Sequence, residues 1–386
     1  MEFDPQALSE LPDPYPIFAD LRENHRIHYS PERDLWVVSR YEDVRAVLTD
    51  AETFASGKGT VPTGFVAMKP MLITQDPPYH THLRSAVHLA FTPRRMAKLD
   101  AFIRRVTREL LDAMEPDAET DLFDALTDPL PVAVITELLG IGFEDRRTFS
   151  HYAGAIIHAN AKEAGHGPSA GEAIEWIYAY LEKVLPEREA NPGDDLVSRL
   201  LHPEPGEPRL THDEVVGFSA LLLMAGTETT TNGLGNALAV LHDRPEIRAR
   251  LAANPAGIPR AVEECLRFES PVPGLSRVTT RDVELHGRKI PEGARVHMAF
   301  AAANRDERQF PKGETFDPDR HPNAHLAFSL GIHFCLGASL ARTELKIALE
   351  ELLARHPGYA VFPERGTRLR SDAARGFSFL PCVAAP

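Results

Sequence analysis

The sequence predicts a mainly α-helical fold with minor β structure. Apolar residues recur every three or four positions over long stretches, for example between Leu99 and Leu111, and this spacing is typical of amphipathic helices. Between Arg277 and Ala299 the spacing falls towards two and turn residues appear, which indicates small strands. The 32 prolines are scattered and no Pro/Gly/Ser-rich tract marks a boundary, so we expect a single domain over residues 1–386.

The N-terminal half is expected to begin with strands and to continue with helices. A short strand pair, Ile27–Ser30 and Trp36–Ser39, precedes a helix that starts near Tyr41. Apolar spacing of three or four then predicts successive helices from Tyr79 to Arg188.

The C-terminal half contains the longest predicted helix. Thr211 and Glu214 form a capping-box pattern at its start, and Pro245 follows its end. After the small strands comes an irregular, proline-bearing stretch at residues 304–334. A final helix is expected from about Cys335 to His356, and short strands close the chain.

Charge and cysteine content exclude several classes of protein. The chain has 42 Lys and Arg against 56 Asp and Glu, a net charge of −14, so we expect it to bind neither nucleic acid nor anionic membranes. No stretch reaches the ~18 apolar residues of a membrane span, and the start lacks the pattern of a signal peptide. Three cysteines are too few for a disulfide framework. We therefore expect a cytoplasmic protein without a membrane anchor.

The segment from Phe328 to Gly337, Phe-Ser-Leu-Gly-Ile-His-Phe-Cys-Leu-Gly, is the strongest candidate for chemistry. Its cysteine, Cys335, lies just before an amphipathic helix, where free amides and the helix dipole stabilise a thiolate. Gly331 and Gly337 would let the backbone lie close against a flat ligand.

Three other roles for Cys335 stay open at this point. A lone cysteine is more often a small buried hydrophobic residue. His333 and Cys335 could form half of a zinc site, although Cys265 and Cys382 lack partners at zinc spacing. Cys335 could also be a nucleophile with His333 as its base.

A second candidate lies in the middle of the long helix, at Ala225-Gly-Thr-Glu-Thr229. Gly226 and the threonines are poor helix formers, and threonine hydroxyls compete for backbone carbonyls. On these residues alone, small side chains at a helix crossing are the simpler explanation.

Two pairs of charged residues share a helix face. Glu264 and Arg267 are three residues apart, and most pairs of this kind are solvated surface pairs. His80 and Arg84 are four residues apart, and together they suit a carboxylate ligand, although a chance surface pair is the more common case. His82 lies between them, and we expect it to be exposed.

These four segments, in their order along the chain, resemble the cytochrome P450 family, and the resemblance spans nearly the whole chain. The cysteine loop of the family usually reads Phe-Gly-x-Gly-x-His-x-Cys-x-Gly, and Ser329 stands here in place of the first glycine. Because serine tolerates a positive φ poorly, we expect the loop to be slightly re-routed. The resemblance implies a helix-rich triangular body with small β-sheets around a buried haem b.

The resemblance also implies a role for each segment. Cys335 is the axial ligand of the haem iron, and Glu228 and Thr229 are the acid and alcohol that supply protons for dioxygen activation. Glu264, Arg267 and Arg320 form a structural network that holds the cysteine loop. The expected haem contacts are His80, Arg84, Ala225, Gly226, Arg277, Phe328, His333, Cys335 and Gly337.

The expected function is that of an external monooxygenase. One atom of dioxygen enters a mostly apolar small molecule by hydroxylation or epoxidation, and electrons come from a ferredoxin or flavodoxin-type donor with its reductase. A non-catalytic haem protein, such as a gas sensor or carrier, is an alternative that would not need Glu228 and Thr229. A peroxide-driven peroxygenase is another, and the intact acid–alcohol pair argues against it.

Two surfaces follow from the resemblance. An acidic donor is expected at a basic patch made of Arg94, Arg95, Lys98, Arg342 and Lys346. The apolar wall of the substrate pocket is assigned to Phe65, Val66, Met68, Leu222, Ala225, Val272, Leu275 and Phe377.

Overall fold

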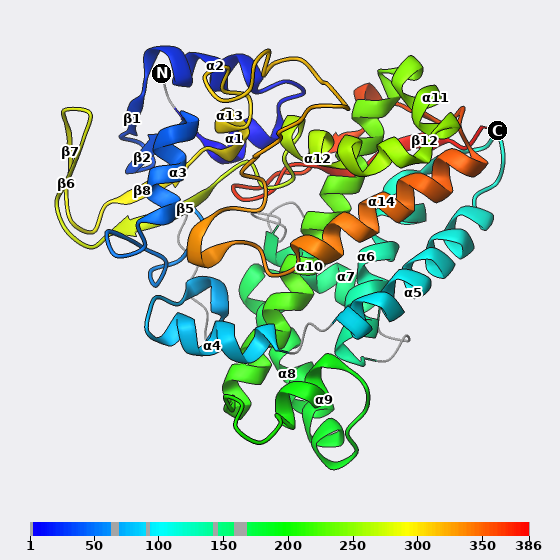
Figure 1. Ribbon diagram of the computed structural model, residues 1–386, viewed down its shortest axis with the longest axis horizontal. Coiled ribbons are helices and arrows are strands. Elements are labelled where there is room, and N and C mark those ends of the chain that lie inside the picture. Colours follow the sequence, from blue (N-terminus) through cyan, green and yellow to red (C-terminus); the bar gives the residue numbers. More distant parts are fainter. Residues whose placement is uncertain (1–2, 63–68, 90–92, 142–145, 158–167, 386) are drawn as a thin grey trace.

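A computed structural model shows a helical majority with small sheets, which confirms the predicted fold class (Figure 1). It describes residues 3–62, 69–89, 93–141, 146–157 and 168–385. The helices are α1 (Pro5–Glu10), α2 (Tyr15–Asn24), α3 (Tyr41–Thr49), α4 (Tyr79–His88), α5 (Pro93–Asp112), α6 (Pro129–Leu139), α7 (Arg146–Ile157), α8 (Ala170–Ala190), α9 (Leu196–Leu201), α10 (His212–His242), α11 (Pro245–Ala253), α12 (Ile258–Phe268), α13 (Phe300–Ala303) and α14 (Ala338–Arg355).

Strands and short helical turns connect these helices. The strands are β1 (Ile27–Ser30), β2 (Leu35–Val38), β3 (Phe54–Ala55), β4 (Glu119–Asp121), β5 (Leu275–Thr279), β6 (Val283–Leu285), β7 (Arg288–Ile290), β8 (Arg295–Met298), β9 (Ala360–Val361), β10 (Thr367–Arg368), β11 (Phe377–Phe379) and β12 (Pro381–Val383). The short turns are η1 (Leu72–Thr74), the π-helical η2 (Phe123–Thr127), η4 (Pro255–Gly257), η5 (Gly331–His333) and η6 (Pro363–Arg365).

The largest sheet joins two segments that are far apart in the sequence, residues 27–55 and residues 275–298. Its order is β1-β2-β8-β5-β3, with β2 and β8 parallel and the other pairs antiparallel. Figure 1 places this sheet and the N-terminus on one side of the molecule and most of the long helices on the other. Haem-binding candidates therefore come both from the sheet, at Arg277 of β5, and from the helices.

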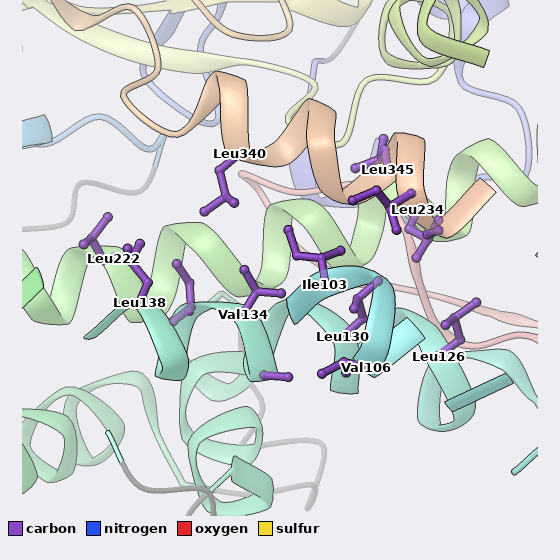
Figure 2. Close-up of a cluster of buried hydrophobic side chains, with 14 of the residues drawn as sticks. Ile103, Val106, Leu126, Leu130, Val134, Leu138, Leu222, Leu234, Leu340 and Leu345 are labelled. Carbon is purple, nitrogen blue, oxygen red and sulfur yellow. The ribbon is translucent and has the colours of Figure 1, made fainter. Parts of the chain in front are cut away.

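Helix α10 is the central element of the helical part. Thr211 caps it and forms the predicted capping box with Glu214, which confirms its start. It packs against α6, α7, α8, α12 and α14, and Figure 2 shows leucines of α14, α10 and α6 pointing towards one another. The apolar cluster drawn there includes Ile103, Val106, Leu126, Leu130, Val134, Leu138, Leu222, Leu234, Leu340 and Leu345.

Three expectations about the elements were wrong in detail. The second strand starts one residue early, at Leu35. Residues 79–188 are not purely helical, because β4 and η2 interrupt them; β4 pairs with β12, a partner more than 250 residues away. The final helix starts at Ala338, because Cys335 still belongs to the loop and Gly337 is the capping residue.

Within the ranges that the structure describes, no helix is both long enough and apolar enough to cross a membrane.

Candidate functional site

The cysteine loop folds back tightly on itself before α14 begins. The Cys335 N–H donates to the carbonyl of Phe328 at 2.9 Å, and the Phe334 N–H donates to Gly331 at 3.1 Å. Gly331 has φ +70°, and a Cβ there would lie 2.8 Å from the Leu48 carbonyl, so two constraints require glycine. A Cβ at Gly337 would meet no atom within 4 Å, which leaves open space beside Cys335.

Ser329 lies in the left-handed region of backbone conformation that favours glycine. Its φ is +61°, although serine tolerates a positive φ poorly. Its hydroxyl is buried and finds no hydrogen-bond partner among the described residues. The serine therefore adds backbone strain and an unsatisfied polar group to the loop.

Four basic side chains converge next to the cysteine loop. His80 and Arg84 come from α4, Arg277 from β5 and His333 from η5. The rings of His80 and His333 lie 4.4 Å apart between centroids, and Arg277 is 3% exposed. Burial, followed by repulsion from Arg277, lowers the pKa of His333 to about 3. Burial also lowers the pKa of Arg277 to about 10.

This cluster fits an anionic ligand. Among the described residues, Asp76 is the carboxylate whose charge acts on His80 and Arg277. Its oxygens already accept hydrogen bonds from the N–H groups of Ser56 and Gly57, both at 2.8 Å. The Nε2 atom of His80 is buried and has no hydrogen-bond partner in the part of the chain that the structure describes. Buried cations are costly unless they are paired, so two carboxylates such as the haem propionates would satisfy this group.

The middle of α10 has an opening, a turn of the helix that other side chains do not cover completely. Ala225 is exposed and Thr229 is half-buried, although most of the surrounding helix is buried. The Thr229 hydroxyl donates to the Ala225 carbonyl at 2.7 Å. The otherwise buried helix is therefore accessible to a bound molecule at this turn.

Glu228 lies buried next to this opening. It is 4% exposed and accepts a hydrogen bond from Asn232 at 3.2 Å. Burial, helped by the charge of Asp128, raises the pKa of Glu228 to about 7. The carboxyl can therefore both give and take a proton near neutral pH.

Gly226 has a packing role that the sequence left open. A Cβ at this position would lie 2.6 Å from Cγ1 of Ile135 on α6. The helix-crossing explanation is therefore correct for this residue, and its predicted contact with the cofactor would have to come from its backbone.

The Glu264 and Arg267 pair is fully buried, so it is not a surface pair. Both side chains are 0% exposed, and two hydrogen bonds of 2.7 Å join them. Arg320 donates to both oxygens of Glu264 at 3.2 Å, and Arg267 also donates to the carbonyls of Asn304 and Gly313. The three predicted members of this network are thus brought together.

The other predicted roles of Cys335 find no support in the geometry. Cys335 is half-buried, whereas Cys265 and Cys382 are both 2% exposed. Within the described part of the chain, no group of three His, Cys, Asp or Glu residues could hold a bare metal ion. His333 is hydrogen-bonded to Ser56 at 3.0 Å, and its low pKa makes it a poor base.

The two predicted surfaces are placed less completely. Phe65, Val66 and Met68 lie outside the described residues, as do the side chains of Arg94 and Arg95. Leu222 and Phe377 belong to the main core, whereas Val272 and Leu275 pack against the cluster of the large sheet. The described cations of the basic patch all have acidic partners: Lys98 with Asp194, Arg342 with Glu263 and Lys346 with Glu350. His82 is exposed, as expected.

Several residues that shape the site carry no motif. Ser56 and Asp76 hold the segment after β3 against His333, and Glu263 binds Arg342 and His325 beside the cysteine loop. Each acts through tertiary contacts, so nothing in the local sequence marks it.

The fold and the site together define a helical protein with a cysteine loop, a cationic cluster and an opening in a central helix. Comparison with known proteins gives the family. A model described as Cytochrome P450 matches residues 166–255 and 258–358. Erythromycin C-12 hydroxylase of Saccharopolyspora erythraea is 41% identical over 359 residues, which cover 91% of this chain and 89% of that protein.

Other relatives agree over nearly the whole chain. Vitamin D(3) 25-hydroxylase of Pseudonocardia autotrophica is 36% identical over 389 residues, covering 97% of this chain and 94% of that protein. The crystal structure of CYP109E1 from Bacillus megaterium in complex with testosterone matches with a TM-score of 0.86 at 35% identity, covering 96% of this chain and 99% of that one. The chain therefore belongs to the cytochrome P450 family, and it is a haem b-dependent monooxygenase that works with a substrate, dioxygen and a redox partner.

Proposed function

We propose that this enzyme hydroxylates or epoxidises a mostly apolar small molecule with electrons from a separate donor. The observation that carries the proposal is the opening at Ala225 and Thr229 in the middle of α10, with the buried acid Glu228 beside it. A gas sensor or carrier would not need an acid whose pKa is about 7 next to a hydroxyl at this position.

In this proposal the chain holds the haem from two sides. Cys335 binds the iron, and His80, Arg84, Arg277 and His333 bind the two propionates. Ala225, Gly226, Phe328 and Gly337 contact the ring. With its thiolate ligand, the bound haem supplies the activation of dioxygen.

The side chains of α10 would then control protons. Glu228 takes up a proton at its buried carboxyl, where Asn232 orients it. Thr229 passes the proton into the opening, because its hydroxyl can donate one hydrogen and accept another. Because the Thr229 hydroxyl donates a hydrogen bond to the Ala225 carbonyl at 2.7 Å, it must rotate away from that carbonyl before it can donate to a group in the opening.

The names of the relatives support a mostly apolar substrate. They mention erythromycin, vitamin D(3) and testosterone. The proposed wall combines Leu222, Val272, Leu275 and Phe377 with Ala225 and with the 65–68 segment. A ferredoxin or flavodoxin-type donor with its reductase would supply the electrons, and the enzyme would work in the cytoplasm. Residues 1–386 would form one haem domain.

The test is turnover with labelled oxygen. Compounds that shift the Soret band on binding would be incubated with the enzyme, a ferredoxin system, reduced nicotinamide and ¹⁸O-labelled dioxygen. We expect one labelled oxygen atom per product molecule. Absence of label from every oxidised product, or turnover with peroxide but not with the electron donor, would contradict the proposal.

A further inference from the structure

Glu263 is the neighbour of the buried Glu264 on α12, but it binds a different part of the chain. Its carboxylate accepts two hydrogen bonds from Arg342 of α14, from Nε at 2.7 Å and from Nη2 at 2.9 Å. It also pairs with Nε2 of His325 at 3.2 Å. Burial raises the pKa of Glu263, but the hydrogen bonds from His325 and Arg342 outweigh it and hold that pKa at about 2.

The hydrogen bonds of His325 fix which ring nitrogen carries the proton. The Ala327 N–H donates to Nδ1 at 3.3 Å, so Nδ1 is an acceptor. Nε2 must then carry the hydrogen and donate it to Glu263. The His325 side chain is only 2% exposed, so this link between the loop and α12 is shielded from water.

Both partners of Glu263 also contact Phe328, the first residue of the cysteine loop. The guanidinium carbon of Arg342 lies 4.4 Å from the centroid of the Phe328 ring, and the ring of His325 lies 5.8 Å from it. The carbonyl of Phe328 in turn accepts the N–H of Cys335 at 2.9 Å. A continuous set of contacts thus leads from Glu263 to the backbone of Cys335.

The two adjacent glutamates hold two successive segments. Glu264, with Arg267 and Arg320, fixes carbonyls and N–H groups between Asn304 and Asn323. Glu263 fixes the next segment, from His325 to Phe328, together with α14. In the sequence, Cys335 lies between His325 and Arg342, the two residues that bind Glu263. Both sides of the cysteine loop are therefore held by one carboxylate.

We propose that Glu263 is a positioning residue for Cys335: through Arg342 and His325 it holds the loop in the geometry that brings the sulfur to the haem. The inference rests on the proposed role of Cys335 as the iron ligand. It also gives Arg342, whose side chain is partly exposed, a structural role in addition to its proposed place in the basic patch for the electron donor.

The test compares Glu263→Gln with Glu350→Gln in the haem-loaded enzyme. Glu350 of α14 is the matched control because it also accepts a hydrogen bond from an arginine, Arg104 of α5, at 2.7 Å, and is similarly exposed. Its ion-pair partners among the described residues, Arg104 and Lys346, lie outside the cysteine loop. The measurement is the rate at which the reduced carbonyl complex loses its red-shifted, thiolate-type Soret band on mild warming, with thermal unfolding followed in parallel.

We expect Glu263→Gln to lose the band about tenfold faster than the unchanged enzyme, a factor that one lost charge-assisted hydrogen bond can give. Glu350→Gln should lose it at the original rate, even if both variants unfold at similarly lowered temperatures. A rate for Glu263→Gln within about twofold of the Glu350→Gln rate overturns the inference, because a difference that small is no more than an ordinary surface pair contributes.

A second variant keeps the test decisive if Glu263→Gln does not fold. His325→Phe retains a ring beside Phe328 but removes the hydrogen bond to Glu263, so it should also speed the loss of the band. An unchanged rate there contradicts the inference. If the unchanged enzyme itself lacks the thiolate-type band, the proposed ligand role of Cys335 fails, which is a separate outcome.

Discussion

At the scale of single residues, the unusual features of this chain are an acid that titrates near neutral pH and a serine in a glycine conformation. Both are consequences of burial. Glu228 is 4% exposed and Ser329 is 7% exposed, so water cannot screen the charge of one or satisfy the hydroxyl of the other. Each therefore gives a measurable effect when it is replaced.

The pKa of Glu228 predicts the pH dependence of turnover. Burial raises that pKa to about 7, and a proton donor must be protonated to act. Turnover should therefore fall as the pH rises through about 7. Glu228→Gln should turn over more slowly and lack this decline, because an amide does not titrate. The measurement is kcat against pH with the electron donor in excess; the same decline in the Gln variant would assign it to another group.

Ser329 predicts a stabilising substitution. A non-glycine residue in the left-handed region costs about 1 kcal/mol or more, and Ser329 has φ +61°. Ser329→Gly should therefore raise the free energy of unfolding of the haem-loaded enzyme by about 1 kcal/mol, measured by thermal unfolding. Ser329→Ala is the control, because it removes the hydroxyl but keeps the strained Cβ. An equal gain from both variants would show that strain is not the cause.

At the scale of elements, α10 combines a close helix crossing with an opening. Gly226 allows α6 to approach on one side, and Ala225 and Thr229 leave space on another. The same run of small residues serves both purposes. The sequence allowed two explanations for this run, a helix crossing and a functional site. The crossing explains Gly226, and the site explains Ala225 and Thr229 of the same helix turn.

The crossing predicts opposite effects for two glycines of α10. Gly226→Ala places a Cβ 2.6 Å from Ile135, so overpacking should outweigh the gain in helix propensity, with a net loss of about 1 kcal/mol. Gly235→Ala meets its nearest atom at 3.9 Å and should gain stability instead. Thermal unfolding measures both. Adding Ile135→Val should restore part of the Gly226→Ala loss; no recovery would place the clash elsewhere.

Elements with local signals could be predicted from the sequence, and elements with distant partners could not. The capping box of Thr211 and Glu214 lies within four residues, so it marks the start of α10 without further information. The start of α14 depends on the bond from Cys335 to Phe328, and β4 depends on β12. These bonds exist only after the chain has folded.

At the scale of the whole molecule, folding and cofactor binding are linked. The cationic cluster joins α4, the large sheet and the cysteine loop, and the buried charge of Arg277 favours the state with an anionic ligand. The members of this cluster were all among the haem contacts expected from the sequence. Asp76 and Ser56, which support His333 from a third segment, could not be predicted because their role depends on the assembled fold.

The linkage predicts the effect of Arg277→Met. The stabilisation that haem binding gives should fall by about 1.5–3 kcal/mol, the range for one hydrogen bond to a charged group, and haem should transfer faster to a haem-scavenging protein. Arg295→Met is the control, since Arg295 is half-buried on the adjacent β8 and, like Arg277, donates to a backbone carbonyl, but it is not a member of the cationic cluster. It should change stability without changing the transfer rate. Equal transfer rates for both variants and the unchanged enzyme would remove Arg277 from the haem site.

The measurement that tests the account most directly is product formed per reduced nicotinamide consumed, with hydrogen peroxide assayed in parallel, for Thr229→Ala. The matched control is Thr227→Ala. Both hydroxyls donate to the carbonyl four residues earlier at 2.7 Å, but Thr227 is 4% exposed, whereas Thr229 faces the opening. We predict that Thr229→Ala keeps consuming electrons and releases peroxide in place of product, while Thr227→Ala stays coupled. Unchanged coupling in Thr229→Ala would contradict the account, because the hydroxyl at the opening would then not be the proton relay.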